Sequence, residues 1–197
     1  MSLITRVMNV ALKPAEEWPV IAAEPATTAG LYTKYIVPLS AIGPVCGFLA
    51  AVMWGQRVPF TSISVQPAIS GLFMIMIVGY LIGLISVAVS ALIIQKLAPT
   101  FKSTGTFVDA LKMVTFSYAP YWLVSVITLI PLVGMLSVLI ALYGLYLFYV
   151  GLPHVMKTPE DQRLPYLGVV IVVSIVVWFV LMGLPALLVG SMLWMNP

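Results

Sequence analysis

The sequence is poor in charge, histidine and cysteine. Only 8% of its 197 residues are Asp, Glu, Lys or Arg, against about 25% in ordinary soluble domains. The net charge of +3 is too small to build a nucleic-acid-binding surface. The single cysteine, Cys46, allows no internal disulfide, and the single histidine, His154, is a poor basis for a metal centre. With 62% hydrophobic residues and a mean hydropathy of +1.13, the chain is predicted to be a membrane protein.

The sequence patterns of common enzymes are also missing. There is no Gly-x-Ser-x-Gly elbow, no Gly-rich phosphate loop and no His-Glu-x-x-His motif. No carboxylate forms an evident triad with His154. We therefore expect a protein that is not an enzyme and that uses no cofactor or metal.

Long intervals without charge predict the membrane spans, because a spanning helix needs about 20 apolar residues. Pro131 and Gly134 divide the longest interval, which is too long for a single helix. The sequence predicts an all-α polytopic membrane protein with five transmembrane helices, and six is the alternative. The membrane domain covers residues 35–182, with approximate spans at 35–54, 68–95, 113–130, 132–152 and 166–182.

The two ends of the chain differ from this domain. Residues 1–34 contain charges that interrupt any apolar core, so they do not resemble a signal peptide. They predict an amphipathic cytoplasmic segment of two short helices in the plane of the interface, the second of which starts at Pro14. Residues 183–197 form an apolar tail after a Gly-Leu-Pro interruption, and either continue the fifth helix or form a sixth short segment.

The positions of the basic residues predict the topology. With the N-terminus inside, every Lys and Arg except Arg57 falls on the cytoplasmic side, as do all six acidic residues. We expect a multi-pass protein of the bacterial inner membrane with a cytoplasmic N-terminus and a periplasmic C-terminus.

The start of the third span has the most informative local pattern. Thr106 and Asp109 have the spacing of a capping box, which would begin a helix and bring Lys112 to the membrane boundary. Pro120 then falls inside this helix and removes one backbone hydrogen bond. The bend is either a kink that only packs, or a hinge or ligand-lined break.

Small residues recur every four positions in the first two spans. Gly43 and Gly47 form one such face, and Gly79 and Gly83 form another. Such faces let helices approach closely. We expect packing within the bundle, with a homo-oligomer interface as the alternative.

The fourth span has tyrosines at a spacing of three, Tyr143, Tyr146 and Tyr149. In lipid, their hydroxyl groups need hydrogen-bond partners. Hydrogen bonds between helices would supply these partners, and so would a polar groove for a lipid headgroup or a small solute. Because no predicted span contains Asp, Glu, Lys or Arg, an ion-coupled transporter is disfavoured.

The charged loops predict a surface for a cytoplasmic or membrane protein partner. In the loop before the fifth span, Thr158 has the position of an N-cap and Pro159 that of the first helical residue. This loop is a solvated connection or part of an epitope shared with the N-terminal segment. The candidate partner-binding residues are Glu16, Glu17, Trp18, Asp109, Glu160 and Asp161.

Four segments resemble the Yip (Ypt/Rab-interacting protein) family, in particular its short bacterial inner-membrane branch, the YohC-like proteins. The segments are PAEEWPVIAAEP, ALKMVTFSYAPYWL, LIPLVGMLSVLIALYGLYLFYVGLP and KTPEDQR, within residues 10–182. The resemblance implies five membrane helices and a cytoplasmic N-terminus. Eukaryotic members are adaptors for small GTPases and carry a longer N-terminal region than the 34 residues found here. The candidate groove or helix-packing residues are Tyr118, Pro120, Pro131, Gly134, Tyr143, Tyr146 and Gly151.

These observations predict a non-enzymatic scaffold or partner-binding membrane protein. The alternative is a pathway for lipid or a small solute without ion coupling.

Overall fold

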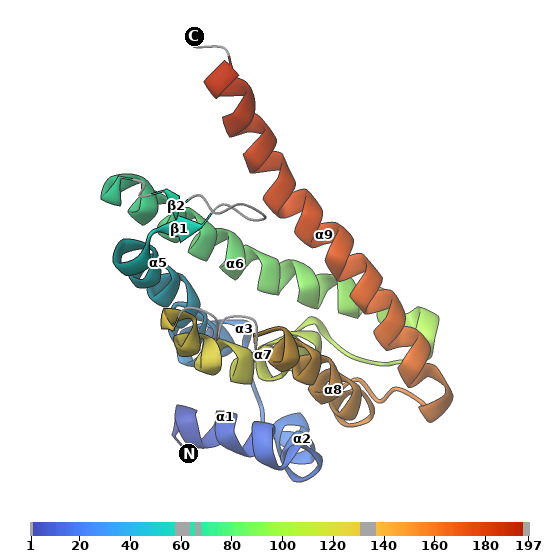
Figure 1. Ribbon diagram of the computed structural model, residues 1–197. Coiled ribbons are helices and arrows are strands. Elements are labelled where there is room, and N and C mark those ends of the chain that lie inside the picture. Colours follow the sequence, from blue (N-terminus) through green and yellow to red (C-terminus); the bar gives the residue numbers. More distant parts are fainter. Residues whose placement is uncertain (1, 58–63, 66–67, 131–136, 195–197) are drawn as a thin grey trace.

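The structure is a computed structural model that describes residues 2–57, 64–65, 68–130 and 137–194. Figure 1 shows helices joined by short loops, with one small antiparallel hairpin of two-residue strands. In this hairpin β1 (Gln56–Arg57) pairs with β2 (Ser64–Val65), and Gln56 lies opposite Val65. The rest of the described chain is helical or loop, which agrees with the predicted fold class at this level.

The helical elements follow one another in a simple order. Two short helices open the chain, four consecutive helical pieces make the next long rod, and four longer helices with two 3-10 turns complete the fold. In chain order they are α1 (Leu3–Leu12), α2 (Pro14–Ala23), α3 (Thr28–Leu31), the π-helix η1 (Tyr32–Ile36), α4 (Val37–Ser40), α5 (Ile42–Trp54), α6 (Ile69–Leu97), the 3-10 helix η2 (Ala98–Phe101), α7 (Phe107–Val124), the 3-10 helix η3 (Ser125–Leu129), α8 (Ser137–Val155) and α9 (Glu160–Trp194).

Three helical stretches are long and apolar enough to cross a membrane, by their length and composition. They are Thr28–Trp54, Ile69–Phe101 and Phe107–Leu129, within the residues that the structure describes. α8 and α9 lie where the fourth and fifth spans are predicted. Two of the three stretches begin earlier than predicted, and each of the three includes charged residues near one end. In the third stretch, Lys112 therefore lies inside the candidate span and not at its edge.

Capping explains where several helices begin. The predicted capping box is confirmed: the Thr106 hydroxyl accepts from the Asp109 amide at 3.3 Å, and the Asp109 carboxylate accepts from the Thr106 amide at 2.9 Å. Pro14 occupies the first turn of α2, also as predicted. Thr158 does not cap α9, which starts at Glu160. Its hydroxyl instead pairs with the Ser103 hydroxyl at 2.9 Å, because the loop that carries Ser103 packs against it.

Prolines do not interrupt the long helices where the sequence suggests a break. α7 continues past Pro120 to Val124, and Pro120 is buried. α9 runs through Gly183 and Pro185 to Trp194, so the predicted interruption does not end this helix. A proline in a membrane helix is tolerated when neighbouring groups or local adjustments satisfy the freed backbone carbonyl. Pro131 and Gly134 lie outside the described residues.

Most of the predicted small-residue faces do not pack inside the bundle. A Cβ atom built on Gly47, Gly79 or Gly83 would meet nothing within 4 Å, whereas one on Gly43 would lie 3.4 Å from the Ser125 hydroxyl oxygen. α6 carries two of these glycines, and its outer side is lined with exposed apolar residues. Packing within the bundle is therefore wrong for three of the four glycines. The homo-oligomer interface stays a prediction.

The core lies where α2, α6, α7, α8 and the start of α9 meet. Tyr166 of α9 is fully buried, stacks on Phe101 with ring centroids 4.7 Å apart, and donates a hydrogen bond to the Ile94 carbonyl of α6. Burial of a whole tyrosine requires such a partner for its hydroxyl group. This contact fixes the first turns of α9 against the end of α6.

The N-terminal helices α1 and α2, which we call the N-terminal hairpin, pack onto the bundle. They lie together along the lower edge of Figure 1. α1 packs against α7, and α2 packs against α8. Trp18 of α2 is fully buried, and a Cβ atom built on Gly151 of α8 would lie only 2.7 Å from its ring. The absence of a side chain at Gly151 therefore makes room for Trp18.

We predict that Gly151→Ala destabilises the protein, whereas Gly79→Ala does not. The new methyl group at residue 151 would overlap the Trp18 ring and the Met113 sulfur, which a Cβ atom would approach to 2.9 Å. Overpacking of this kind costs about 1–3 kcal/mol. Gly79 has open space, so its replacement only improves helix propensity. Thermal unfolding of both variants in detergent measures the difference, and equal midpoints would contradict the contact.

Candidate functional site

A network of charged side chains joins the N-terminal hairpin to α7. The Arg6 guanidinium of α1 pairs with the carboxylates of Glu17 in α2 and Glu24 just after it. The side chains of Arg6 and Glu17 are only 6% and 9% exposed. Asn9 adds a hydrogen bond from its side-chain amide to the second Glu17 oxygen, at 3.3 Å. Two charges are therefore buried, and each is neutralised by a direct partner.

Lys112 connects this network to the bundle. The residue is 5% exposed, and its ammonium group donates to the backbone carbonyl oxygens of Glu24 at 2.7 Å and Ala22 at 3.4 Å. These carbonyls belong to the C-terminal end of α2, where the helix dipole and the unpaired carbonyls favour a cation. Lys112 thus caps α2 from a different helix.

The electrostatics of Arg6 follow from its partners. Burial by itself disfavours the charged guanidinium, but the hydrogen bonds and negative charges of Glu24 and Glu17 offset this effect. Arg6 therefore stays charged, and the network depends on its two acidic partners. We call Arg6, Glu17, Glu24 and Lys112 the hairpin charge network.

Two buried donors in the same region have no hydrogen-bond partner among the described residues. They are Arg6 Nε and the indole Nε1 of Trp18. A buried unpaired N–H group costs free energy, on the order of 1–3 kcal/mol. The hairpin is thus held by ion pairs and by the packing of Trp18 against Gly151, but two N–H groups at its contact with the bundle lack hydrogen-bond partners.

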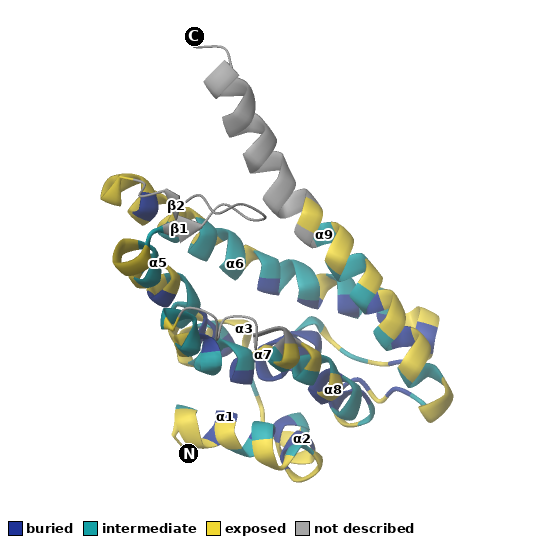
Figure 2. Cartoon of the chain, in the orientation of Figure 1, coloured by how far each residue is buried: buried dark blue, intermediate teal, exposed yellow. Residues whose placement is uncertain are grey.

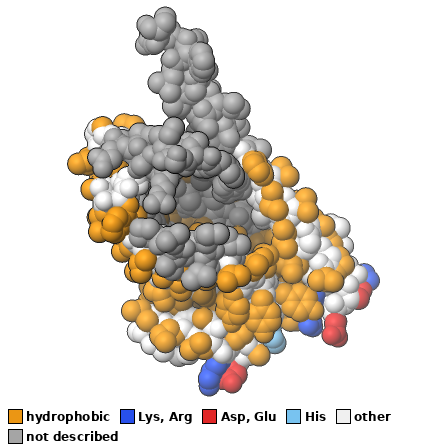
Figure 3. Space-filling view, viewed as in Figure 1, with side chains coloured by type: hydrophobic (Ala, Val, Ile, Leu, Met, Phe, Trp, Pro, Cys, Tyr) orange, Lys and Arg blue, Asp and Glu red, His pale blue; other side chains and the backbone are white. Residues whose placement is uncertain are grey.

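A second group of charges lies at the end of the bundle where α6 ends, α7 begins, α8 ends and α9 begins. We call this the charged end; it is the right-hand end in Figure 1, and charged side chains appear along the lower right of Figure 3 while apolar ones cover most of the other described surface. Its exposed charged residues include Lys102 and Lys157 in the loops, and Glu160 and Asp161 in the first turn of α9.

The loops of the charged end are fixed against each other. The Thr104 amide donates to the Met156 carbonyl at 2.9 Å, and Gly105 lies so close to Met156 that a Cβ atom there would be 2.3 Å from the sulfur. Lys102 and Lys157 both have a φ of 53°, which is uncommon for residues other than glycine. These contacts hold both loops in defined conformations.

Asp161 forms the outer edge of this surface. Its carboxylate accepts a hydrogen bond from the Gln162 side chain at 2.8 Å and lies 4.0 Å from the Lys102 ammonium. The pKa of Asp161 is lowered chiefly by the Gln162 amide and further by the positive charge of Lys102. The group is therefore ionised at neutral pH and presents a negative charge to the solvent.

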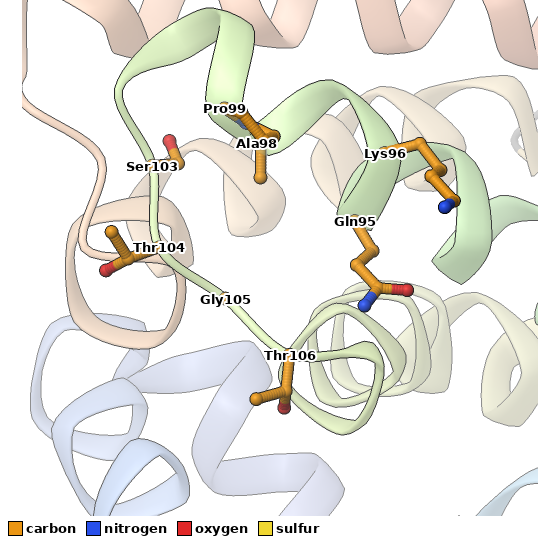
Figure 4. Close-up of a pocket in the computed structure, with 8 residues that line it drawn as sticks. All are labelled: Gln95, Lys96, Ala98, Pro99, Ser103, Thr104, Gly105 and Thr106. Atoms are coloured by element: carbon orange, nitrogen blue, oxygen red, sulfur yellow. The ribbon is translucent and has the colours of Figure 1, made fainter.

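A shallow pocket of about 550 Å³ lies beside these loops, between the end of α6 and the start of α7. In Figure 4 the Gln95 side chain extends toward Thr106, whereas the Lys96 ammonium points away from the loop. The other lining residues are small or bear a hydroxyl group. The charged group of Lys96 does not point to the centre of the pocket. The full lining is Gln95, Lys96, Ala98, Pro99, Ser103, Thr104, Gly105 and Thr106.

The candidate partner-binding residues differ in how far they are buried. Glu17 and Trp18 are buried, so a partner cannot contact them while the hairpin is docked. Asp109 is half-buried and caps α7. Glu16, Glu160 and Asp161 are exposed.

The candidate groove residues that the structure describes do not line the pocket beside the charged end. The Tyr143 hydroxyl donates to the Ala11 carbonyl of α1 at 2.5 Å, and its ring lies 5.6 Å from that of Tyr146. Tyr118 and Tyr146 are exposed on the outside of the bundle, and Gly151 is covered by Trp18. None of these residues lines the described pocket.

Sequence reasoning missed the hairpin charge network. Arg6 lies on the same helix face as the buried residues Val7 and Val10, which is a signal that a charge is buried there. Its partners could not be identified from the sequence, because Glu24 is 18 positions away and Lys112 bonds to Glu24 over 88 positions.

We predict that Arg6→Gln releases the hairpin and that Lys13→Gln does not. Without Arg6 the Glu17 carboxylate is buried without a counter-charge, which costs about 3–5 kcal/mol. Lys13 makes only an exposed pair with Glu16 at 3.5 Å, and such pairs contribute little.

Cleavage by a protease specific for glutamate measures this release, because the bond after Glu17 is protected while α2 is docked. We expect the rate to rise at least tenfold in Arg6→Gln and to stay unchanged in Lys13→Gln. Equal cleavage of Arg6→Gln and the unchanged protein would show that the ion pairs do not hold the hairpin.

In the part of the chain that the structure describes, no three His, Cys, Asp or Glu residues are grouped as metal ligands.

Comparison with known families gives a match over most of the chain. The Yip1 domain model matches residues 8–182, which include the N-terminal hairpin from Met8 onward, the charged end and α6 to α8 in full. Comparison with curated proteins and with solved structures found no match for this chain. A match over this length of the sequence shows the family: the chain belongs to the Yip1 domain family.

Proposed function

We propose that this protein is a non-enzymatic scaffold that binds a partner through its charged end. Family membership and the apolar helices make it a membrane protein. The single observation that supports partner binding is the surface of the charged end. There Lys102 is exposed on a loop, and Glu160 and Asp161 are exposed on the first turn of α9, beside loops that contact each other. A surface with little conformational freedom loses little entropy when a partner binds.

We further propose that the charged end faces the cytoplasm of a bacterial cell and that the five helices all cross the inner membrane. The excess of Lys and Arg at this end supports the orientation, since cytoplasmic loops of membrane proteins carry such an excess. α8 and the 35-residue α9 supply the fourth and fifth crossings in this arrangement.

The surface available to the partner is narrower than the sequence suggests. Glu17 and Trp18 are used to dock the hairpin, and Asp109 is used to start α7. The partner then contacts Glu16, Glu160, Asp161 and the lysines beside them. A partner that bears both charge signs, such as a cytoplasmic protein loop, fits this mixture.

We predict that reversal of the acidic charges removes the partner. Glu160→Lys combined with Asp161→Lys changes only exposed side chains, so folding should be unaffected. Crosslinking in cells followed by mass spectrometry should find a stoichiometric protein with the unchanged chain and at least tenfold less with the variant.

Arg57→Glu, in β1 at the other end of the bundle, is the matched control and should keep the partner. If the double variant and the control recover the same proteins, the charged end is not the binding surface. If one lipid is enriched and no protein is found, a lipid pathway replaces the scaffold as the better account.

A further inference from the structure

The outer side of α1 carries an exposed apolar stripe. Ile4, Met8 and Leu12 lie at a spacing of four, on one face of the helix, and are 57%, 49% and 74% exposed. The opposite face holds Val7 and Val10, which are fully buried. Figure 2 shows both buried and exposed residues along α1. A helix that is apolar on both sides is expected to have an apolar environment on both sides.

The depth of α1 along the bundle can be measured from its partners. Val7 packs with Ala119 of α7, which lies twelve residues from Phe107 at the charged end of that helix. Ala11 accepts the hydrogen bond of Tyr143, which lies twelve residues from Val155 at the charged end of α8. At 1.5 Å per residue, both contacts are about 18 Å from the charged end along the helices. Leu3 joins the same cluster as Leu123, which lies deeper still.

This depth does not fit a helix on the membrane surface. α7 and η3 together form the candidate span Phe107–Leu129, and the hydrocarbon core of a bilayer is about 30 Å thick. A position about 18 Å from one end of this span falls inside the hydrocarbon, whereas an interfacial helix inserts its apolar face by only about 5–10 Å.

The hairpin charge network explains how α1 can lie there. An arginine inside a membrane is costly and must be paired. Arg6 is paired twice, with Glu17 and Glu24, and Lys112 is satisfied by two carbonyls of the α2 end. The charges of Arg6 and Lys112 are therefore turned inward, and the stripe is turned outward.

We infer that α1 is inserted in the bilayer leaflet next to the charged end, and that Ile4, Met8 and Leu12 bind lipid acyl chains there. The lipid-facing surface of the bundle then continues from the exposed apolar side chains of the spans onto α1. This differs from the helix in the plane of the interface that the sequence predicts. The N-terminal hairpin is part of the membrane domain, and a partner at the charged end meets α2, the loops and the first turn of α9.

Spin labels at single cysteines test this placement in the full-length protein. Cys46→Ala first removes the only cysteine. Cysteines are then placed at Ile4, Met8 or Leu12, and at Glu16 as the matched control on the exposed side of α2. The labelled proteins are reconstituted in vesicles of phosphatidylcholine and phosphatidylglycerol, and collisions with oxygen and with a water-soluble nickel chelate are compared.

The labels at residues 4, 8 and 12 should collide at least several-fold more with oxygen than with nickel relative to the label at residue 16, which should favour nickel. Preferential nickel contact at residues 4 and 8 would place α1 in water and overturn the inference. Labels that neither reagent reaches would mean that protein, such as a second copy of this chain, covers the stripe instead of lipid. Arg6→Gln in the Met8 background should shift the label toward nickel, and the exposed-pair variant Lys13→Gln should not.

Discussion

The buried pairing of Arg6 with Glu17 and Glu24 is the interaction on which the arrangement of the N-terminal hairpin depends. It closes α1 onto α2, and Lys112 then ties the end of α2 to α7 through two backbone carbonyls. A charge removed from water is stabilising only when its partners are complete. Each residue of the hairpin charge network therefore requires the others. The two short helices behave as a unit that the helix propensity of either one would not hold together.

The contacts made by this unit extend to the rest of the bundle. With Trp18 seated over Gly151, the hairpin covers α8, and the Tyr143 hydroxyl group of α8 reaches the backbone of α1. The candidate partner-binding residues are thereby separated by role. Glu17 and Trp18 act inside the protein, and Glu160 and Asp161 remain outside.

Local features were predictable from the sequence, and contacts between distant segments were not. The Thr106–Asp109 capping box and the start of α2 at Pro14 depend on neighbouring residues only, and both are confirmed. Thr158 was predicted to cap α9, but its hydroxyl bonds to Ser103, which is 55 positions away. Small residues identify faces that could pack, but Gly79 shows that the pattern does not say whether a neighbour is present. Family resemblance was confirmed because it depends on residues spread along the whole domain.

The central claim is that the N-terminal hairpin is an integral part of the membrane domain and not a free arm. Hydrogen–deuterium exchange of the full chain in lipid nanodiscs tests it most directly, since docked and free helices of ten residues differ greatly in amide protection. The account predicts that the amides of α1 and α2 exchange about as slowly as those of α7. Complete exchange of both short helices within seconds, while α7 stays protected, would contradict it.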